Sequence, residues 1–332
     1  MRLLFIALFF VLFQSCKSEN SKERNFKLLE RITSIENYDD EGFFSDVRCM
    51  TFNNNHLYFT DYGNSELYKY SKKNFKLDKV IGGYGDGPGE FRGIPYFFIS
   101  DNQKLYLEND YKRSIEIFDE DNAYEKTKKL PGLYSNLRYG YRFFMHKNKF
   151  YSTHSSSLKP IFEFNLINDS VRVGGKPFKF EYEAQNRMRN NNHVFKFNKN
   201  IITVSDNMPI VRFYDFDFKL RKEVSLEHYP EVKKTMDYIR LKELETDDSS
   251  FYVLIQDAYL FSDKLYLLIS SYEPYSNNKI IVFNVKEEGD LVYDKTFYLD
   301  QKSDYKSIAS DNEILVAFNT ETTFVDIFDL KI

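Results

Sequence analysis

Arginine and tyrosine side chains are the groups of this sequence best suited to binding a ligand. Those that fall in the predicted loops or close to them are Arg48, Arg92, Tyr96, Arg138, Tyr141 and Arg142. Guanidinium groups hold carboxylate or sulfate through paired hydrogen bonds, and tyrosine rings stack on sugars. This set therefore predicts a site for an anionic or glycan ligand. The sequence leaves open the alternative that the arginines pair with Asp46, Glu90 or Glu183 as solvated loop charges.

A second set of side chains carries the oxygen and nitrogen atoms that metal ions prefer. Its members are Asp46, Asp61, Asn109, His154 and Asp206. Such groups bind calcium or zinc where three or more of them converge, and they then support metal-dependent chemistry. No HExxH or CxxC motif accompanies them, and segment 61–64 lacks the remaining ligands of a calcium loop. Residues of these types are also common in turns, so both interpretations stay open.

The glycine-rich segment 82–89 (GGYGDGPG) has some features of a phosphate-binding loop, because backbone N–H groups unobstructed by a Cβ can surround an anion. Such loops continue through Lys-Ser or Lys-Thr into a helix. Here no such pair follows, and the next residues are typical of a strand. We therefore expect a structural turn, with Phe91 packed between two sheets.

The overall composition narrows the class of protein that carries these residues. The chain has 332 residues, of which 46 are basic and 50 acidic, with pI ≈ 5.9. This balance argues against a dedicated nucleic-acid binder. A mean hydropathy of −0.53 excludes a polytopic membrane protein. Aromatic residues make up 18 %, while Gly (13) and Pro (8) are scarce, so a packed core is expected.

The N-terminus carries the features of a secretion signal. Arg2 precedes an apolar stretch at 3–13 that is too short to span a membrane comfortably, so residues 1–15 are expected to be a signal peptide. Ser15 then precedes Cys16, a pattern that resembles the lipobox of bacterial lipoproteins, whose cysteine receives diacylglycerol. Residues 16–25 would form a flexible tether and residues 26–332 the folded domain. The acyl chains would hold the protein on the outer membrane of the cell envelope.

A repeat organises the remaining residues. An apolar pair followed by an alternating segment that ends in an aromatic residue occurs six times. The pairs begin at Leu57, Leu105, Phe150, Ile201, Leu265 and Ile314. Their spacings of 48, 45, 51, 64 and 49 residues are close to the length of a propeller blade, about 40 to 50 residues. Six such units predict six blades.

Period-two alternation predicts four strands in each unit. The innermost strands are expected at 47–52, 95–100, 141–146, 193–197, within 251–261 and at 305–309. The sixth unit lacks a fourth strand, and pairing with the N-terminal strand 26–35 would close the ring and remove exposed sheet edges. The longest spacing holds an insertion at 231–248, where Val232, Met236, Ile239 and Leu244 recur at helical intervals.

Two segments resemble a known family. Residues 57–70 (LYFTDYGNSELYKY) are similar to the core of an NHL-type repeat, and residues 85–91 (GDGPGEF) resemble the GxGPGEF signature of six-bladed β-propeller lipoproteins of Gram-negative bacteria. Together with Cys16, these motifs indicate that family, which includes NHL-like and TolB-like propellers. The resemblance implies an all-β, six-bladed propeller of four-stranded blades. The specific motifs cover only the first two units, so it implies little about activity.

From these observations we expect a monomeric binding or interaction module. Loops from every blade of a propeller converge at the mouth of its channel, where the predicted arginines and tyrosines would bind a glycan or an envelope protein, without nucleic acid or cofactor. One alternative is a propeller enzyme of the lactonase or lyase type, in which the second set of side chains would bind calcium or zinc. Another is a scaffold within an envelope complex.

Overall fold

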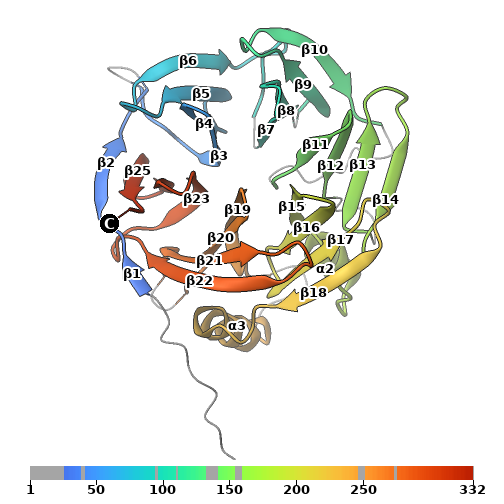
Figure 1. Ribbon diagram of the computed structural model, residues 1–332, viewed down its shortest axis with the longest axis vertical. Coiled ribbons are helices and arrows are strands. Elements are labelled where there is room, and N and C mark those ends of the chain that lie inside the picture. Colours follow the sequence, from blue (N-terminus) through green and yellow to red (C-terminus); the bar gives the residue numbers. More distant parts are fainter. Residues whose placement is uncertain are drawn as a thin grey trace, which may run out of the picture.

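The computed structural model describes residues 26–38, 42–93, 96–109, 111–131, 141–153, 159–245, 251–272 and 275–331. These residues form six sheets arranged as the blades of a ring (Figure 1). The first strand of each blade lies next to the central channel, and the last lies at the outside. This arrangement confirms the predicted six-bladed β-propeller.

The first three blades contain four antiparallel strands each. From the channel outwards, blade 1 has β3 (Val47–Asn53), β4 (His56–Asp61), β5 (Glu66–Ser71) and β6 (Leu77–Gly82). Blade 2 has β7 (Phe97–Ile99), β8 (Leu105–Asn109), β9 (Ser114–Phe118) and β10 (Tyr124–Lys129). Blade 3 has β11 (Phe144–His146), β12 (Lys149–Ser152), β13 (Ile161–Asn165) and β14 (Val171–Gly174). The inner strands β7 and β11 have only three residues each.

The inner strands of the next three blades are longer than those of blades 2 and 3. Blade 4 has β15 (Asn192–Phe197), β16 (Asn200–Ser205), β17 (Ile210–Tyr214) and β18 (Leu220–Ser225). Blade 5 has β19 (Ile255–Phe261), β20 (Lys264–Ile269), β21 (Lys279–Val285) and β22 (Leu291–Tyr298). Blade 6 takes three strands from the C-terminal part of the chain, β23 (Tyr305–Ser310), β24 (Ile314–Asn319) and β25 (Phe324–Asp329).

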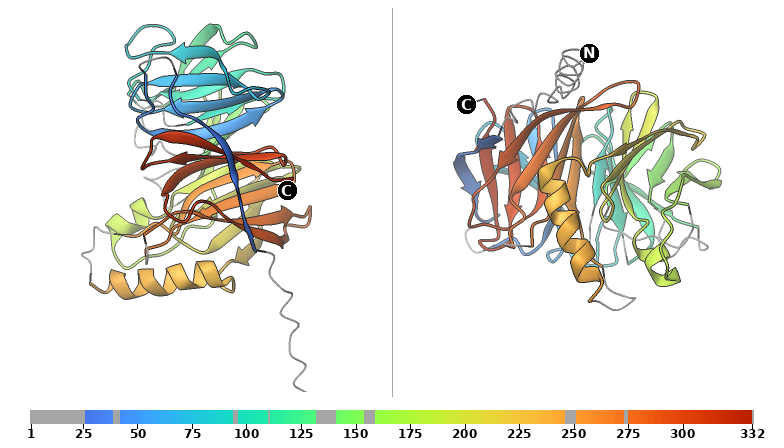
Figure 2. Two further views of the ribbon diagram at one scale, coloured as in Figure 1. Left: turned by 90° about the vertical axis from the view of Figure 1, so that its left-hand side faces the viewer. Right: turned by 90° about the horizontal axis from the view of Figure 1, so that it is seen from below.

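The N-terminal strand closes the ring, as predicted, but it is divided between two blades. β2 (Arg31–Ile35) pairs antiparallel with β25 and supplies the fourth strand of blade 6. β1 (Phe26–Leu28) instead pairs parallel with β22 and adds a fifth strand to blade 5. The segment therefore runs along the outside of the ring from one blade to the next (Figure 2). The single strand expected at 26–35 changes partner at residues 29 and 30.

Packing between blades explains why the middle strands are buried on both faces. All five residues of β9 are buried, whereas β10 at the outside of the same blade is mostly exposed or half-buried. Large aromatic side chains such as Phe59, Tyr68 and Phe150 are fully buried between sheets. The high aromatic content of the sequence therefore fills the wedge-shaped spaces of the ring, since such rings bury a large apolar area each.

The propeller has two faces, which differ in the connections that they carry. The loop face carries the connections that lead into each first strand and the turns between second and third strands. The hairpin face carries the tight turns between first and second strands. Figure 2 shows the ring from its side, with the strands running between these two faces.

The glycine-rich segment forms the expected turn on the loop face. Phe91 is fully buried among the side chains of blades 1 and 2, and its backbone N–H donates to the carbonyl of Gly83 at 2.9 Å. A Cβ at Gly82 would lie 2.5 Å from the Phe91 ring, and the φ of Gly82 is +92°. Glycine is therefore required there both by space and by backbone conformation.

The predicted insertion forms a helix at the side of the ring. α3 spans Pro230–Glu243 with Pro at its first turn, and it buries Val232, Met236 and Ile239 against strands of blades 4 and 5. Leu244, expected on the same apolar face, is 85 % exposed because the helix ends before it. A second helix, α2 (Glu183–Met188), was not predicted. Within the described ranges, no helix has the length and apolar character that a membrane crossing requires.

Candidate ligand-binding site

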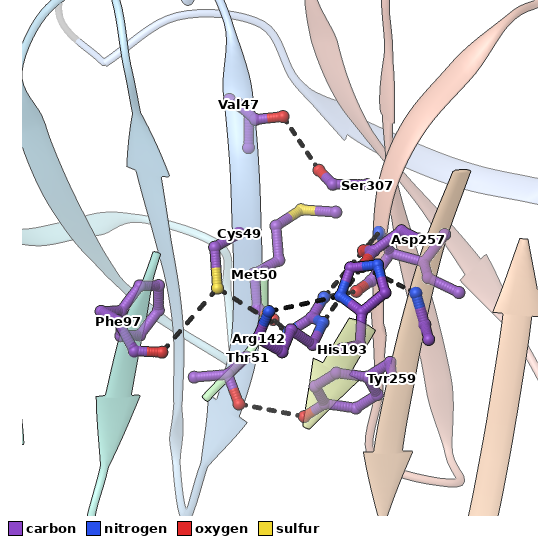
Figure 3. Close-up of polar contacts among 12 residues, drawn as sticks. Val47, Cys49, Met50, Thr51, Phe97, Arg142, His193, Asp257, Tyr259 and Ser307 are labelled. Carbon is purple, nitrogen blue, oxygen red and sulfur yellow. Dashed lines mark hydrogen bonds and ion pairs between the residues drawn. The ribbon is translucent and has the colours of Figure 1, made fainter. Parts of the chain in front are cut away.

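Arg142, one of the predicted ligand-binding residues, lies inside the ring rather than at an exposed mouth. It stands two residues before β11, and its side chain is 7 % exposed. Nε and Nη2 donate to the two carboxylate oxygens of Asp257 on β19, at 3.1 and 2.7 Å. Nη1 donates to the carbonyl of Met50 at 3.0 Å, and Nη2 donates to that of Ile308 at 2.8 Å. Figure 3 shows these contacts.

Further neighbours extend the contacts of Arg142 to every other blade. Nη1 lies 3.7 Å from Sγ of Cys49, and the backbone N–H donates to Nδ1 of His193 at 3.3 Å. The rings of Tyr259 and Tyr96 have their centroids 4.8 and 6.0 Å from the guanidinium carbon. A guanidinium has five N–H donors, and these internal contacts use all of them. The position of Arg142 thus differs from the predicted one, because its donors hold blades together instead of facing an incoming ligand.

The ion pair between Arg142 and Asp257 is fully enclosed. The Asp257 side chain is 0 % exposed, and its carboxylate also accepts the backbone N–H groups of Ile308 at 2.9 Å and Ala258 at 2.8 Å. Removing one partner of such a pair costs about 3–5 kcal/mol, because the other charge stays buried without compensation. The pair therefore ties blade 3 to blades 5 and 6 across the channel.

Groups around the ion pair keep a fixed protonation state near neutral pH. Burial and the positive charge of Arg142 lower the pKa of His193 to about 3, so its imidazole is neutral and accepts through Nδ1. Burial raises the pKa of the Cys49 thiol to about 11, which keeps it protonated and unreactive. The centre of the ring is therefore a structural barrier across the channel.

A cavity of about 590 Å³ lies on the hairpin side of this barrier. Its walls come from the inner strands of blades 1 to 5, and Arg142 is one of the residues that line it. Tyr259, another lining residue, bonds through its hydroxyl to Thr51 Oγ1 at 3.1 Å. The cavity thus opens at the opposite end of the channel from the predicted mouth.

The lining of the cavity changes from aromatic to charged along the strands. The phenylalanine and tyrosine side chains are Phe97, Phe98, Tyr106, Phe143, Phe144, Phe195 and Tyr259. Towards the hairpin face the lining includes Asp101 and Asn102 from the turn after β7, His146 and Lys147 at the end of β11, and Lys196 near the end of β15. The lining thus combines an aromatic wall with a polar rim, and its exposed surface is somewhat more polar than apolar.

The cationic side of this rim acts on His146. Burial lowers the pKa of His146, and the nearby charges of Lys196 and Lys147 lower it further, against a smaller opposing effect of Asp101. The imidazole also packs on the ring of Phe216, with centroids 4.9 Å apart. His146 is therefore neutral at pH 7. Its pKa depends on the charges at the cavity mouth.

Arg48 and Arg92 lie on the loop face, and each has an acidic partner. Nη2 of Arg48 is 2.8 Å from Oδ2 of Asp46, as in the alternative that the sequence left open. Arg92 pairs with Asp86 rather than with Glu90. The guanidinium groups also rest on tyrosine rings, with that of Arg48 3.8 Å from the centroid of Tyr62 and that of Arg92 4.7 Å from that of Tyr111.

Three other predicted residues come together around His193 at the loop-face end of the channel. The Tyr141 hydroxyl donates to Oδ2 of Asp206 at 2.6 Å. The His193 ring has its centroid 5.4 Å from that of Tyr141 and 6.2 Å from that of Tyr96. Burial raises the pKa of Asp206 to about 7, although the hydrogen bond from Tyr141 opposes this. The group therefore joins two predicted ligand-binding tyrosines to one predicted metal ligand.

The remaining candidates for metal binding serve turns or surface pairs. Asp61 accepts the backbone N–H of Ser45 at 2.6 Å and that of Gly63 at 3.0 Å, and Asn109 accepts that of Lys112 at 3.1 Å. Within the part of the chain that the structure describes, no three His, Cys, Asp or Glu side chains are grouped to hold a metal ion.

Asp46, the other member of that set, lies between Arg48 and Lys306 and pairs with both. Cys16, Arg138 and His154 lie outside the described residues. The lipid anchor and the metal-binding alternative therefore stay predictions.

Sequence reasoning missed Asp257 and His193. A signal for the first was present, because an acidic residue interrupts the apolar run 252–261 (YVLIQDAYLF), and Arg142 stands beside the apolar residues of another predicted inner strand. Buried charges need a partner of opposite sign. One isolated acid and one isolated base on strands that face the same channel could have been paired on that ground.

Comparisons with known proteins show the fold and no more. No protein-family model matches the sequence, and no curated protein matches it. Among solved structures, a member of the DUF4221 family from Bacteroides vulgatus has 10 % identity and a TM-score of 0.60, and the alignment covers 91 % of this chain and 97 % of that one.

Two further solved structures are similar over most of their length. A putative exported protein from Bacteroides fragilis has 14 % identity and a TM-score of 0.58, with 91 % of this chain and 94 % of that one covered. A streptogramin B lyase has 11 % identity and a TM-score of 0.50, with 90 % and 87 % covered. At these identities the likeness supports a shared propeller fold, which is consistent with a binding or interaction module.

Proposed function

We propose that this protein is a lipid-anchored ligand-binding module of the bacterial cell envelope, whose ligand enters the channel from the hairpin face. The signal-like residues 1–15 and Cys16 support export and anchoring. The similarity to a propeller described as a putative exported protein is consistent with export. The polar residues before the first described strand would give the propeller freedom to reach its ligand.

The observation that carries the proposal is the cavity of about 590 Å³ on the hairpin side of the ring, which Arg142 lines at its inner end. Small-molecule sites have volumes of about 300–1,000 Å³ and are mainly apolar, with a few polar groups that fix the ligand. This cavity has a volume in that range and an aromatic wall, and its rim is more polar than that of a typical small-molecule site.

Binding in the cavity can be tested with an introduced fluorophore, because the chain contains no tryptophan. Tyr106→Trp places one in the cavity wall, whereas Tyr275→Trp places one at a loop-face residue that is 65 % exposed. Small molecules from envelope extracts are expected to change the emission of the first variant and not of the second. Equal responses, or none in either variant, would contradict a ligand site in the cavity.

Anchoring can be tested by fractionation and by metabolic labelling with palmitate. Cys16→Ser should move the protein from the membrane to the soluble fraction and abolish labelling. Cys49→Ser is the matched control, because Cys49 is buried in the propeller. This substitution should leave membrane association and palmitate labelling unchanged. A Cys16→Ser variant that stays in the membrane fraction would remove the lipid anchor from the proposal.

A further inference from the structure

The mouth of the channel cavity carries more positive than negative charge. Lys147 and Lys196 both line it and are exposed. Asp101 is the only acidic side chain among the described lining residues. The positive charge of Arg142 at the inner end is balanced by Asp257. An anion that approaches the mouth therefore meets a net attraction that a low-dielectric cavity concentrates.

Charge and apolar surface are separated along the depth of the cavity. Along β11 the lining passes from Lys147, just after the strand, through Met145 to Phe143, just before it. On β15 it passes from Lys196 to Phe195. The apolar residues lie nearer to the ion pair, and the cations lie nearer to solvent. A molecule that fills both parts needs an apolar body and a charged end on the same side as the opening.

We propose that the cavity binds an amphipathic organic anion, with its apolar body among the aromatic side chains and its carboxylate or sulfonate at Lys147 and Lys196. This inference rests on the proposed function, which makes the cavity the binding site. It differs from the prediction of arginines on the loop face, because the cations are lysines on the opposite face. Neutral molecules of the same shape gain the apolar contacts but lose the attraction of the rim.

His146 provides a second readout of the same event. Its pKa is lowered by burial and by the charges of Lys196, Lys147 and Lys149, while Asp101 raises it. A carboxylate bound between the two rim lysines adds a negative charge close to the imidazole. The pKa of His146 should therefore rise on binding, which two-dimensional NMR of the ring can measure. A neutral ligand should leave it almost unchanged.

The experiment compares naphthoate with naphthamide, which share one aromatic body and differ in charge. Calorimetric titration of the full-length protein should show naphthoate binding about tenfold more tightly. Lys147→Glu combined with Lys196→Glu should abolish this preference. Lys199→Glu is the matched control, because Lys199 is exposed in the turn after β15 but does not line the cavity, and it should keep the preference.

The outcomes separate this inference from the proposed function. Equal affinity for the two probes, unchanged by the double substitution, would overturn the anionic ligand class while leaving the cavity as a site. Leu260→Trp narrows the cavity from β19 and should weaken both probes, with folding checked by thermal melting. If neither probe binds, or if Leu260→Trp weakens neither, the cavity is not the site and both proposals fail.

Discussion

The two halves of the ring are built differently. In the half formed by blades 5, 6 and 1, side chains of the inner strands bond directly to another of these three blades. Ser307 Oγ donates to the carbonyl of Val47 at 3.0 Å, and the hydroxyl of Tyr259 accepts the N–H of Phe52 at 3.2 Å. One continuous cluster of buried apolar residues extends through all three blades. We call this part the closed half.

The open half, formed by blades 2, 3 and 4, supplies most of the residues that line the cavity, and the closed half supplies Thr51, Tyr259 and Leu260. Two of its inner strands, β7 and β11, have three residues each, and residues just before and after these strands also line the cavity. The apolar cluster shared by blades 3 and 4 has six buried members among the described residues. Another large apolar cluster joins blades 1, 2 and 3, and a further one joins blades 4 and 5. Among the described residues, the sparser packing is therefore confined to the boundary between blades 3 and 4.

The largest expected effect comes from breaking the link between the halves. Arg142→Met should lower the free energy of unfolding by about 4 kcal/mol, because Asp257 stays buried without its partner. Equilibrium denaturation in urea measures this loss. Adding Asp257→Leu should recover part of the stability, since both charges are then absent. A single variant that loses less than about 1 kcal/mol would contradict the assigned role of the ion pair.

A second test concerns the pairing of β2 with β25, which closes the ring within the closed half. Asp326 on β25 is 0 % exposed and accepts hydrogen bonds from Ser34 Oγ at 2.6 Å and Tyr305 Oη at 3.0 Å. Asp326→Ala leaves these donors without their acceptor and should cost about 3 kcal/mol in denaturation experiments. Asp329→Ala, near the end of the same strand, should cost about 0.5 kcal/mol or less.

Matched truncations compare packing in the two halves directly. Leu315 belongs to the closed-half cluster and is fully buried, so Leu315→Ala should cost about 3 kcal/mol. Ile99 is half-buried at the wall of an existing cavity, so Ile99→Ala should cost about 1 kcal/mol. The difference of about 2 kcal/mol would be read from urea denaturation. Equal losses would show that the halves do not differ in packing as described.

The smallest effect is a pH dependence of the free energy of unfolding, which arises from His193 beside Arg142. His193 has its pKa lowered to about 3 in the folded state, so the unfolded chain binds the proton more readily. Its contribution is fully present above the unfolded pKa of about 6.5 and decreases as pH falls below it. From pH 7 to pH 5.5 the loss should be about 1 kcal/mol. His193→Gln should reduce this dependence, and an unchanged pH profile would contradict it.

Local patterns in the sequence were sufficient to predict the number of blades and their strands. Alternation within each unit and the missing fourth strand after Phe328 predicted six blades and the closing role of the N-terminal strand. The division of that strand at residues 29 and 30 was not predicted. It depends on which neighbouring edges, β22 and β25, come within reach once the ring has formed.

The site was less accessible to sequence reasoning, for physical reasons. The partners of Arg142 come from several blades, so no spacing along the chain reveals them. The cavity lies beside β7 and β11, which have three residues each, whereas the sequence predicted strands of six residues at both places. Tyr141 and Asp206 were proposed for different chemistries, and only the fold shows that they bond to each other.

The parallel pairing of β1 has a mechanical consequence. Any pull on the chain that precedes Phe26 acts first on the three residue pairs between β1 and β22. β2 lies further along the chain and is loaded only after those pairs have separated. The short strand β1, which belongs to the sheet of blade 5, thus protects the pairing of β2 with β25 in blade 6 from an applied force. A moderate force on the N-terminal chain can therefore detach β1 while the pairing of β2 with β25, which closes the ring, stays intact.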